Sequence, residues 1–114
     1  MLNITSHKGF QLTFQNGWTA SVQFGRGNYC SKRYSLDIAE ASSNWKSENA
    51  EILIFDKAGA GLFGEITLNN VNAENVAKAC FIVSEFPVDS LVTEEVKSQF
   101  RVRYGISIFS NLIT

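Results

Sequence analysis

The residue types best suited to chemistry gather in one short stretch, residues 25 to 34, which reads GRGNYCSKRY. Its cations could donate hydrogen bonds to phosphate oxygens, its tyrosine rings could stack on a base, and its two glycines free the backbone. The spacing is that of neither a Walker loop nor a dinucleotide fold. A solvated loop that serves only solubility is the competing interpretation. The candidate ligand-binding residues are Arg26, Asn28, Tyr29, Lys32, Arg33 and Tyr34.

Catalytic side chains are scarce. His7 is the single histidine, so a Ser-His-Asp or Cys-His mechanism would have to use it, and no nucleophile is placed beside it. Cys30 lies among cations that favour a reactive thiolate, although a packed or idle thiol is commoner. Cys80 falls on the apolar side of a predicted helix, where cysteine packs as a small hydrophobe. Because no metal-ligand spacing appears either, the sequence predicts a protein that is not an enzyme and needs no metal or cofactor.

Composition predicts one self-sufficient domain over residues 1–114. The hydrophobic share of 45% is enough to build a core without disulfides. The formal net charge of −1 gives no global attraction to nucleic acid or to an anionic membrane. No apolar run approaches the roughly 20 residues of a membrane span, and the N-terminus lacks a signal-peptide pattern. Two distant cysteines fit a reducing cytosol.

Two amphipathic strands meet at Asn16-Gly17, because apolar and polar residues alternate on both sides of it between residues 10 and 24. A two-residue loop would place the two apolar rows on opposite faces. A three-residue loop with Gly17 left-handed in a G1 bulge repairs this. We therefore predict a bulged hairpin that pairs Phe14 with Trp18, Leu12 with Ala20 and Phe10 with Val22.

The middle of the chain predicts a second hairpin and a helix. The run EILIFD over residues 51–56 indicates a strand buried on both sides or central in the sheet. The glycine-rich residues 57–61 suit a loop, in which Asp56 serves turn chemistry, and a returning strand is expected within residues 62–68. Asn70 or Asn72 can cap a helix that ends before Pro87. Its apolar stripe comprises Val76, Ala79, Cys80, Val83 and Phe86.

Two further elements are expected near the C-terminus. Asp89 or Ser90 can cap a shorter helix with Val92, Val96 and Phe100 on one side. From Phe100 to Ile108 the period changes to two, which predicts an edge strand with Arg101 and Arg103 pointing to solvent. The fold class is therefore α+β, with an antiparallel sheet of about five strands packed with one or two helices.

A long connection over residues 25–49 separates the first hairpin from the next strand. Loops beyond about 12 to 15 residues are usually functional or disordered, so this segment is the main functional candidate. Trp45 within it serves either as a packed core residue or as a partner contact, since tryptophan is enriched at binding hot spots.

The stretches GFQLTFQNGWTASVQFGRGNYC and EILIFDKAGAG resemble a family of small proteins encoded by tailed bacteriophages and prophages. That family typically pairs an NGW hairpin and a GxGNYC-type turn with an AExxIFD strand and a following helix. The resemblance covers about the first sixty-five residues, and the sequence departs from the pattern over residues 88–114. The matching residues are Asn16, Gly17, Trp18, Gly25, Gly27, Asn28, Tyr29, Cys30, Ala50, Glu51, Ile54, Phe55 and Asp56.

The resemblance implies an accessory phage protein that acts in the bacterial host cytoplasm. The expected function is to bind and inhibit or modulate a host protein, for example an anti-phage defence protein. Contacts are expected around Trp45, Tyr29 and Tyr34, or at Arg101 and Arg103. The alternative is a module that sequesters a signalling nucleotide or binds nucleic acid through the basic, aromatic stretch. A homo-oligomer stays open, and no membrane partner is expected.

Overall fold

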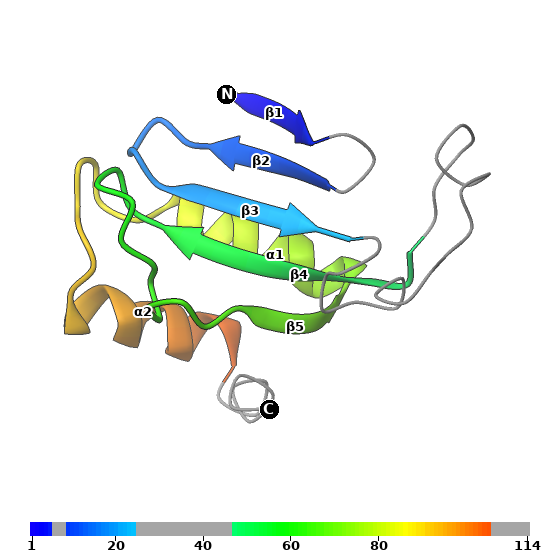
Figure 1. Ribbon diagram of the computed structural model, residues 1–114. Coiled ribbons are helices and arrows are strands. Elements are labelled where there is room, and N and C mark those ends of the chain that lie inside the picture. Colours follow the sequence, from blue (N-terminus) through cyan, green and yellow to red (C-terminus); the bar gives the residue numbers. More distant parts are fainter. Residues whose placement is uncertain (6–8, 25–46, 106–114) are drawn as a thin grey trace.

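The computed structural model describes residues 1–5, 9–24 and 47–105, which form an antiparallel sheet with two helices. The five strands are neighbours in the order in which the chain forms them (Figure 1). The predicted α+β fold with a sheet of about five strands is confirmed. The elements are β1 (Leu2–Thr5), β2 (Gly9–Thr13), β3 (Thr19–Gln23), β4 (Asn49–Phe55), β5 (Leu68–Asn72), α1 (Ala73–Ser84) and α2 (Glu94–Tyr104).

The hairpin of β2 and β3 has the predicted bulged register. Phe10 lies opposite Val22, and Leu12 lies opposite Ala20. The backbone N–H of Phe14 donates to the carbonyl of Trp18 at 2.8 Å, and Gly17 has a φ of 94°. A residue with a β-carbon is strained in that conformation, which is why glycine occupies the third loop position.

β4 is an interior strand, as expected, because β3 and β5 pair with its two edges. The strand predicted within residues 62–68 is wrong, since β5 begins only at Leu68. After the turn at residues 57–60, Gly61 makes a single bridge to Phe55. Leu62 is fully buried, and the Phe63 ring packs against Phe100. These residues therefore do not continue as a strand beside β4, because their side chains are part of the core under the helices.

β1 is a strand that the sequence did not predict. It pairs antiparallel with β2, and the pairing extends to its N-terminal neighbour, where the amino group of Met1 donates to the carbonyl of Thr13 at 2.7 Å. Four residues are too few to show a periodic pattern. The fifth strand is therefore at the opposite end of the chain from the predicted one.

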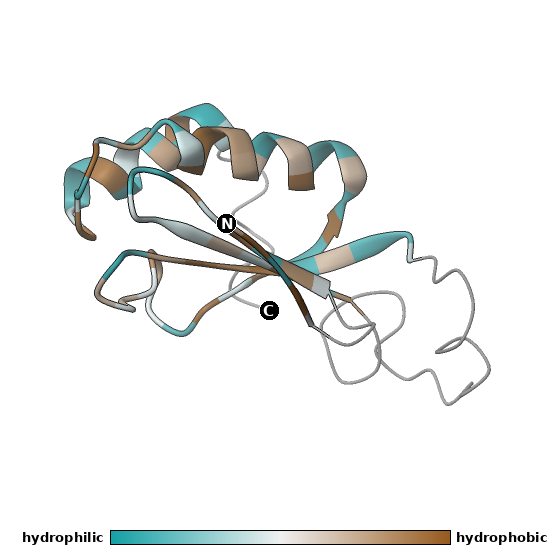
Figure 2. Cartoon of the chain, turned by 90° about the horizontal axis from the view of Figure 1, so that it is seen from above, coloured by the Kyte–Doolittle hydropathy of each residue, from teal (hydrophilic) through white to brown (hydrophobic). Residues whose placement is uncertain are grey.

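α1 begins after Asn72, one of the two predicted caps, and its apolar stripe faces the sheet. It ends at Ser84, two residues before Phe86, which closed the predicted stripe. Asn72 caps it by accepting from the N–H of Asn75 at 2.9 Å. The helix packs on β3, β4 and β5, and Figure 2 shows the helical layer on one side of the sheet. The buried core comprises Trp18, Val22, Ala50, Ile52, Ile54, Leu62, Leu68, Val71, Ala79, Ile82, Val83, Phe86, Val96, Phe100 and Tyr104.

α2 replaces the predicted C-terminal strand over the described residues 100–104. Val96, Phe100 and Tyr104 are four residues apart and all buried, which is the spacing of one helix face. The predicted edge strand is therefore wrong up to residue 105, and the rest of it, including Ile106 and Ile108, lies outside the described residues. Thr93 caps α2 by accepting from the N–H of Val96 at 3.2 Å.

The predicted caps of α2 have other partners. Asp89 has a left-handed backbone, with a φ of 60°, and its N–H donates to the carbonyl of Asn16. The hydroxyl of Ser90 accepts a hydrogen bond from the indole N–H of Trp18 at 2.9 Å. Because both residues bind the first hairpin, the helix starts later.

Asn16 joins the turn of the first hairpin to the end of α1. Its side chain is 4% exposed. The amide nitrogen donates to the carbonyls of Val83 and Phe86, at 2.8 and 3.0 Å, and the amide oxygen accepts from the N–H of Trp18 at 3.0 Å. These buried bonds fix where α1 ends relative to the sheet.

Asp56 performs the predicted turn chemistry and also makes a tertiary contact. One carboxylate oxygen accepts from the N–H groups of Ala58 and Ala60, at 2.9 and 3.0 Å. The other accepts from the N–H of Val92 at 3.0 Å. The end of β4 is thereby tied to the connection that leads into α2.

We predict that Asn16→Ala lowers the free energy of unfolding by about 2 to 3 kcal/mol, because buried groups lose their hydrogen-bond partner. Equilibrium unfolding in urea measures the change. The matched control is Gln15→Ala at the exposed neighbouring turn position, for which a change within about 0.5 kcal/mol is expected. Equal stability of the two variants would show that the Asn16 contacts do not hold the hairpin to α1.

A second prediction concerns alkaline pH. Burial raises the pKa of Tyr104 to about 12 from its ordinary 10.0. Between these values the unfolded chain releases the phenolic proton while the folded chain keeps it, so the free energy of unfolding falls as pH rises through this window. Below pH 10 this group has no such effect.

The measurement is the difference in unfolding free energy between the wild type and Tyr104→Phe, from pH 8 to the highest pH at which both proteins still unfold reversibly. Lysine titration is common to both proteins and cancels in the difference. We expect the difference to shift in favour of the variant above pH 10. A difference that is constant over the whole range would contradict the prediction.

Candidate functional site

Most of the predicted binding residues lie outside the described part of the chain. This holds for Arg26, Asn28, Tyr29, Lys32, Arg33, Tyr34 and Trp45, and also for His7 and Cys30. Of the connection predicted at residues 25–49, residues 47–49 are described. Those three residues line a pocket.

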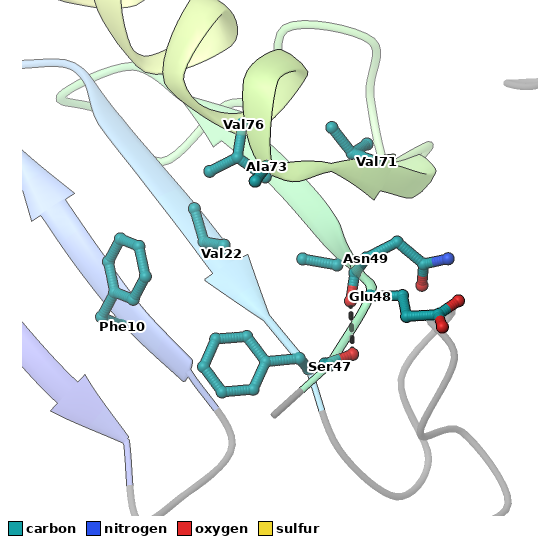
Figure 3. A pocket seen from close by; sticks show the side chains of 10 residues that line it. Phe10, Val22, Ser47, Glu48, Asn49, Val71, Ala73 and Val76 are labelled. Carbon is teal, nitrogen blue, oxygen red and sulfur yellow. Dashed lines mark hydrogen bonds between the residues drawn. The ribbon is translucent and has the colours of Figure 1, made fainter. Parts of the chain in front are cut away.

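The pocket lies between the start of α1 and the adjoining ends of the central strands (Figure 3). Its volume is about 550 Å³. Phe10 and Val22 reach it from the sheet, and Ala73 and Val76 reach it from the first turns of α1. The remaining lining residues are Phe24, Ser47, Glu48, Asn49, Ala50 and Val71.

The described lining is apolar at its base and polar at one rim. The hydroxyl of Ser47 donates to the backbone carbonyl of Asn49 at 2.7 Å, which holds the chain in a turn where it enters β4. Glu48 brings a carboxylate to this rim, and the described lining contains no lysine or arginine. Phosphate recognition needs cationic donors, so these residues suit an apolar group better than a phosphate.

Arg101 and Arg103 lie on the last turn of α2, not on an edge strand. Both are exposed, as expected, but each also covers an aromatic ring. The guanidinium carbon of Arg101 is 5.5 Å from the centre of the Phe63 ring, and that of Arg103 is 5.8 Å from the centre of the Phe81 ring. Arg103 also forms an ion pair with Glu85, which directly follows α1.

The contacts of Arg103 bring Phe81 and Glu85 together with it, and we define these three residues and Val102, the neighbour of Arg103 on α2, as the helical surface. Phe81 is 61% exposed and Val102 is 73% exposed. Val102 and Arg103 also line a shallow hollow along α2, with a volume of about 390 Å³. Large apolar side chains and an arginine thus share one accessible region at the ends of the two helices.

Sequence reasoning did not single out Phe81. The predicted stripe of α1 runs through Ala79, Cys80 and Val83, and Phe81 falls outside that stripe. A phenylalanine on the polar side of an amphipathic helix is the available signal, because such a residue has no place in the core.

Cys80 packs against the core as predicted. Its side chain is partly buried beside the buried cluster. Burial raises the pKa of the Cys80 thiol, which keeps the group in its neutral and less reactive form.

The described residues contain no cluster of three or more side chains that could hold a metal ion. Among the same residues, neither helix has the length and apolar character needed to cross a membrane.

Comparison of the chain with protein-family models, curated proteins and solved structures finds no match.

Proposed function

We propose that this protein acts by binding another protein through the helical surface, and that it performs no catalysis. The observation that carries the proposal is the exposed Phe81 ring, with the Arg103 guanidinium above it and the Glu85 carboxylate bound to that guanidinium. Aromatic residues and arginine dominate the energetics of protein interfaces, and charged residues around them form a polar rim.

Phe81 is suited to be the anchor of this interface. Phe81 is more than half exposed in the isolated chain, so a partner could remove much of its apolar surface from water. A phenylalanine loses little conformational freedom on binding, because only two side-chain torsions must be fixed. Burial of this ring is therefore the main expected source of affinity.

Arg103 is already oriented in the free protein. The ion pair with Glu85 and the contact with the Phe81 ring hold a long side chain that would otherwise be mobile. A preordered arginine reduces the entropy cost of association. Val102 and the adjoining hollow on α2 add apolar contact area and a place for a side chain of the partner.

The class of partner follows from the resemblance to phage proteins. The proposed target is a host bacterial protein, such as one that defends the cell against phage, and the proposed place of action is the host cytoplasm. A short chain can block a site on another protein more readily than it can build a catalytic site of its own. This setting favours an inhibitor or modulator.

The test uses a photo-crosslinking amino acid, benzoylphenylalanine, at position 81 of the full chain in a bacterial host. We expect irradiation to yield one crosslinked protein at a fixed ratio, because the ring at this position should lie inside the interface. The matched control carries the same amino acid in place of Thr13, an exposed residue on the sheet face that points away from α1. Identical products from the two positions would contradict a partner at the helical surface.

Affinity for the crosslinked protein then provides a quantitative check. We expect Phe81→Ala and Arg103→Glu each to weaken binding by about 30-fold or more, as hot-spot residues do. Glu74→Ala is the control, because Glu74 is an exposed residue in the first turn of the same helix. Circular dichroism confirms that the variants fold. Unchanged affinity of Phe81→Ala would refute the assignment of the anchor.

The pocket supports a second candidate function, the binding of a small ligand with an apolar body. The supporting observation is its largely apolar described lining, with Phe10, Val22 and Val76 around it. The nucleotide-binding alternative depends on Arg26, Lys32 and Arg33, which lie outside the described residues, and it stays a prediction.

Native and denaturing mass spectra of protein purified from a bacterial host test this second function. We expect Val76→Phe, which fills the pocket from α1, to abolish a ligand mass that the wild type carries and loses on denaturation. Ala77→Phe adds an aromatic ring at an adjacent exposed position of the helix and should leave that mass in place. Absence of a passenger from the wild type would count against a constitutively bound ligand.

A further inference from the structure

Among the described strands, β1 pairs only with β2 and leaves its outer edge unpaired, and the register shows which backbone groups point outward. Met1 and Thr13 exchange two backbone hydrogen bonds, at 2.7 and 2.8 Å. Hydrogen-bonded and non-hydrogen-bonded pairs alternate along an antiparallel ladder. Leu2 and Ile4, which lie opposite Leu12 and Phe10, are therefore the non-hydrogen-bonded positions. Their N–H and C=O groups point away from β2, toward the open edge.

The side chains of the same two residues are exposed. Leu2 is 62% exposed and Ile4 is 75% exposed. They share the sheet face of Phe10 and Leu12, which is the face that α1 covers, but α1 packs on β3, β4 and β5. The first strand thus lies beyond the helical layer (Figure 1), where its apolar side chains are exposed.

β1 is short, with four residues, but it lacks three other devices that protect an edge strand. Its residues, LNIT, include no charged residue and no proline, and its pairing with β2 contains no bulge. The other edge of the sheet differs. β5 has a shifted register against β4, and Asn70 within it has a left-handed φ of 53°. Such an irregular strand is a poor template for a further strand.

We propose that two copies of this protein associate through β1, so that the two strands pair antiparallel about a two-fold axis perpendicular to the sheet. Leu2 of one copy then lies opposite Ile4 of the second copy, and the two Asn3 residues lie opposite each other at the axis. In this register the outward N–H and C=O groups of Leu2 and Ile4 all find partners.

Self-complementarity is the reason to assign a second copy as the occupant. A two-fold interface must match its own surface, and β1 does so in its backbone groups and in its side chains. An axis perpendicular to the sheet keeps the helical layers of both copies on one side. The exposed apolar side chains of Leu2 and Ile4 consequently form a row that continues from one copy to the other. β1 carries no charged side chain, so no two like-charged side chains of this strand would face each other across the pairing.

Charge exchange across this interface provides the test, with sedimentation velocity as the measurement. The wild type should form a dimer whose fraction rises with concentration. L2K/I4K and L2E/I4E should each be monomeric, because every new charge would face a like charge of the second copy. An equimolar mixture of the two variants should restore a dimer of one copy of each.

The substituted side chains are exposed in the isolated chain, so folding should survive, and circular dichroism checks this. A wild type that remains monomeric at millimolar concentration would overturn the proposal, and so would a dimer that L2K/I4K retains. A monomeric wild type that captures a different protein through β1 would likewise overturn the assignment of a second copy.

A disulfide test reports the register. In a non-hydrogen-bonded antiparallel pair the Cα atoms are about 4.5 Å apart, which allows a disulfide. Asn3→Cys should therefore form a covalent dimer on mild oxidation, whereas Gln15→Cys, at the exposed hairpin turn, should not. Equal crosslinking of both variants would overturn the proposed pairing. The outcome is independent of the helical surface, which lies on other elements.

Discussion

The buried amide of Asn16 is the contact on which the arrangement of the two layers depends. One side chain closes its own turn through the N–H of Trp18 and also binds the carbonyls of Val83 and Phe86 at the end of α1. The indole of Trp18 continues this attachment, since it packs against Phe86 and donates to Ser90. A shift of the helix along the sheet would therefore break these buried hydrogen bonds, which costs free energy. The connection into α2 receives its place from the same contacts and from Asp56.

This attachment determines the positions of both the helical surface and β1. It fixes the end of α1, so that Phe81 and Glu85 stand beside Arg103 at the end of α2. It also places α1 over β3 to β5, which leaves β1 beyond the helical layer. The two surfaces differ in physical character. The helical surface offers side chains held in place before binding, whereas β1 offers backbone hydrogen bonds and two exposed aliphatic residues.

For the candidate binding residues, residue types alone predicted exposure but not the surrounding structure. Arg101 and Arg103 were identified as exposed contact residues, and both are exposed, but on a helix that places each over an aromatic ring. The pocket was not predicted, because residues from β2, β3, β5, the start of β4 and α1 meet there only after folding. Phe81 was overlooked for the same reason. Its environment depends on α2, which the sequence pattern had replaced in part by a strand.

The sequence by itself determined the elements whose signals are local. The register of the first hairpin follows from matching two apolar rows across a turn, and the limits of α1 follow from Asn72 and Pro87. Tertiary structure decided the C-terminal part. Phe100, Val102 and Tyr104 alternate as in a strand, yet Phe100 and Tyr104 are also one helical turn apart. Both periods fit the sequence. In the structure Phe100 and Tyr104 are buried in the core beside Phe63 and Phe86, whereas Val102 is exposed to water. β1 likewise forms because β2 presents an edge, a partner that no pattern within four residues can reveal.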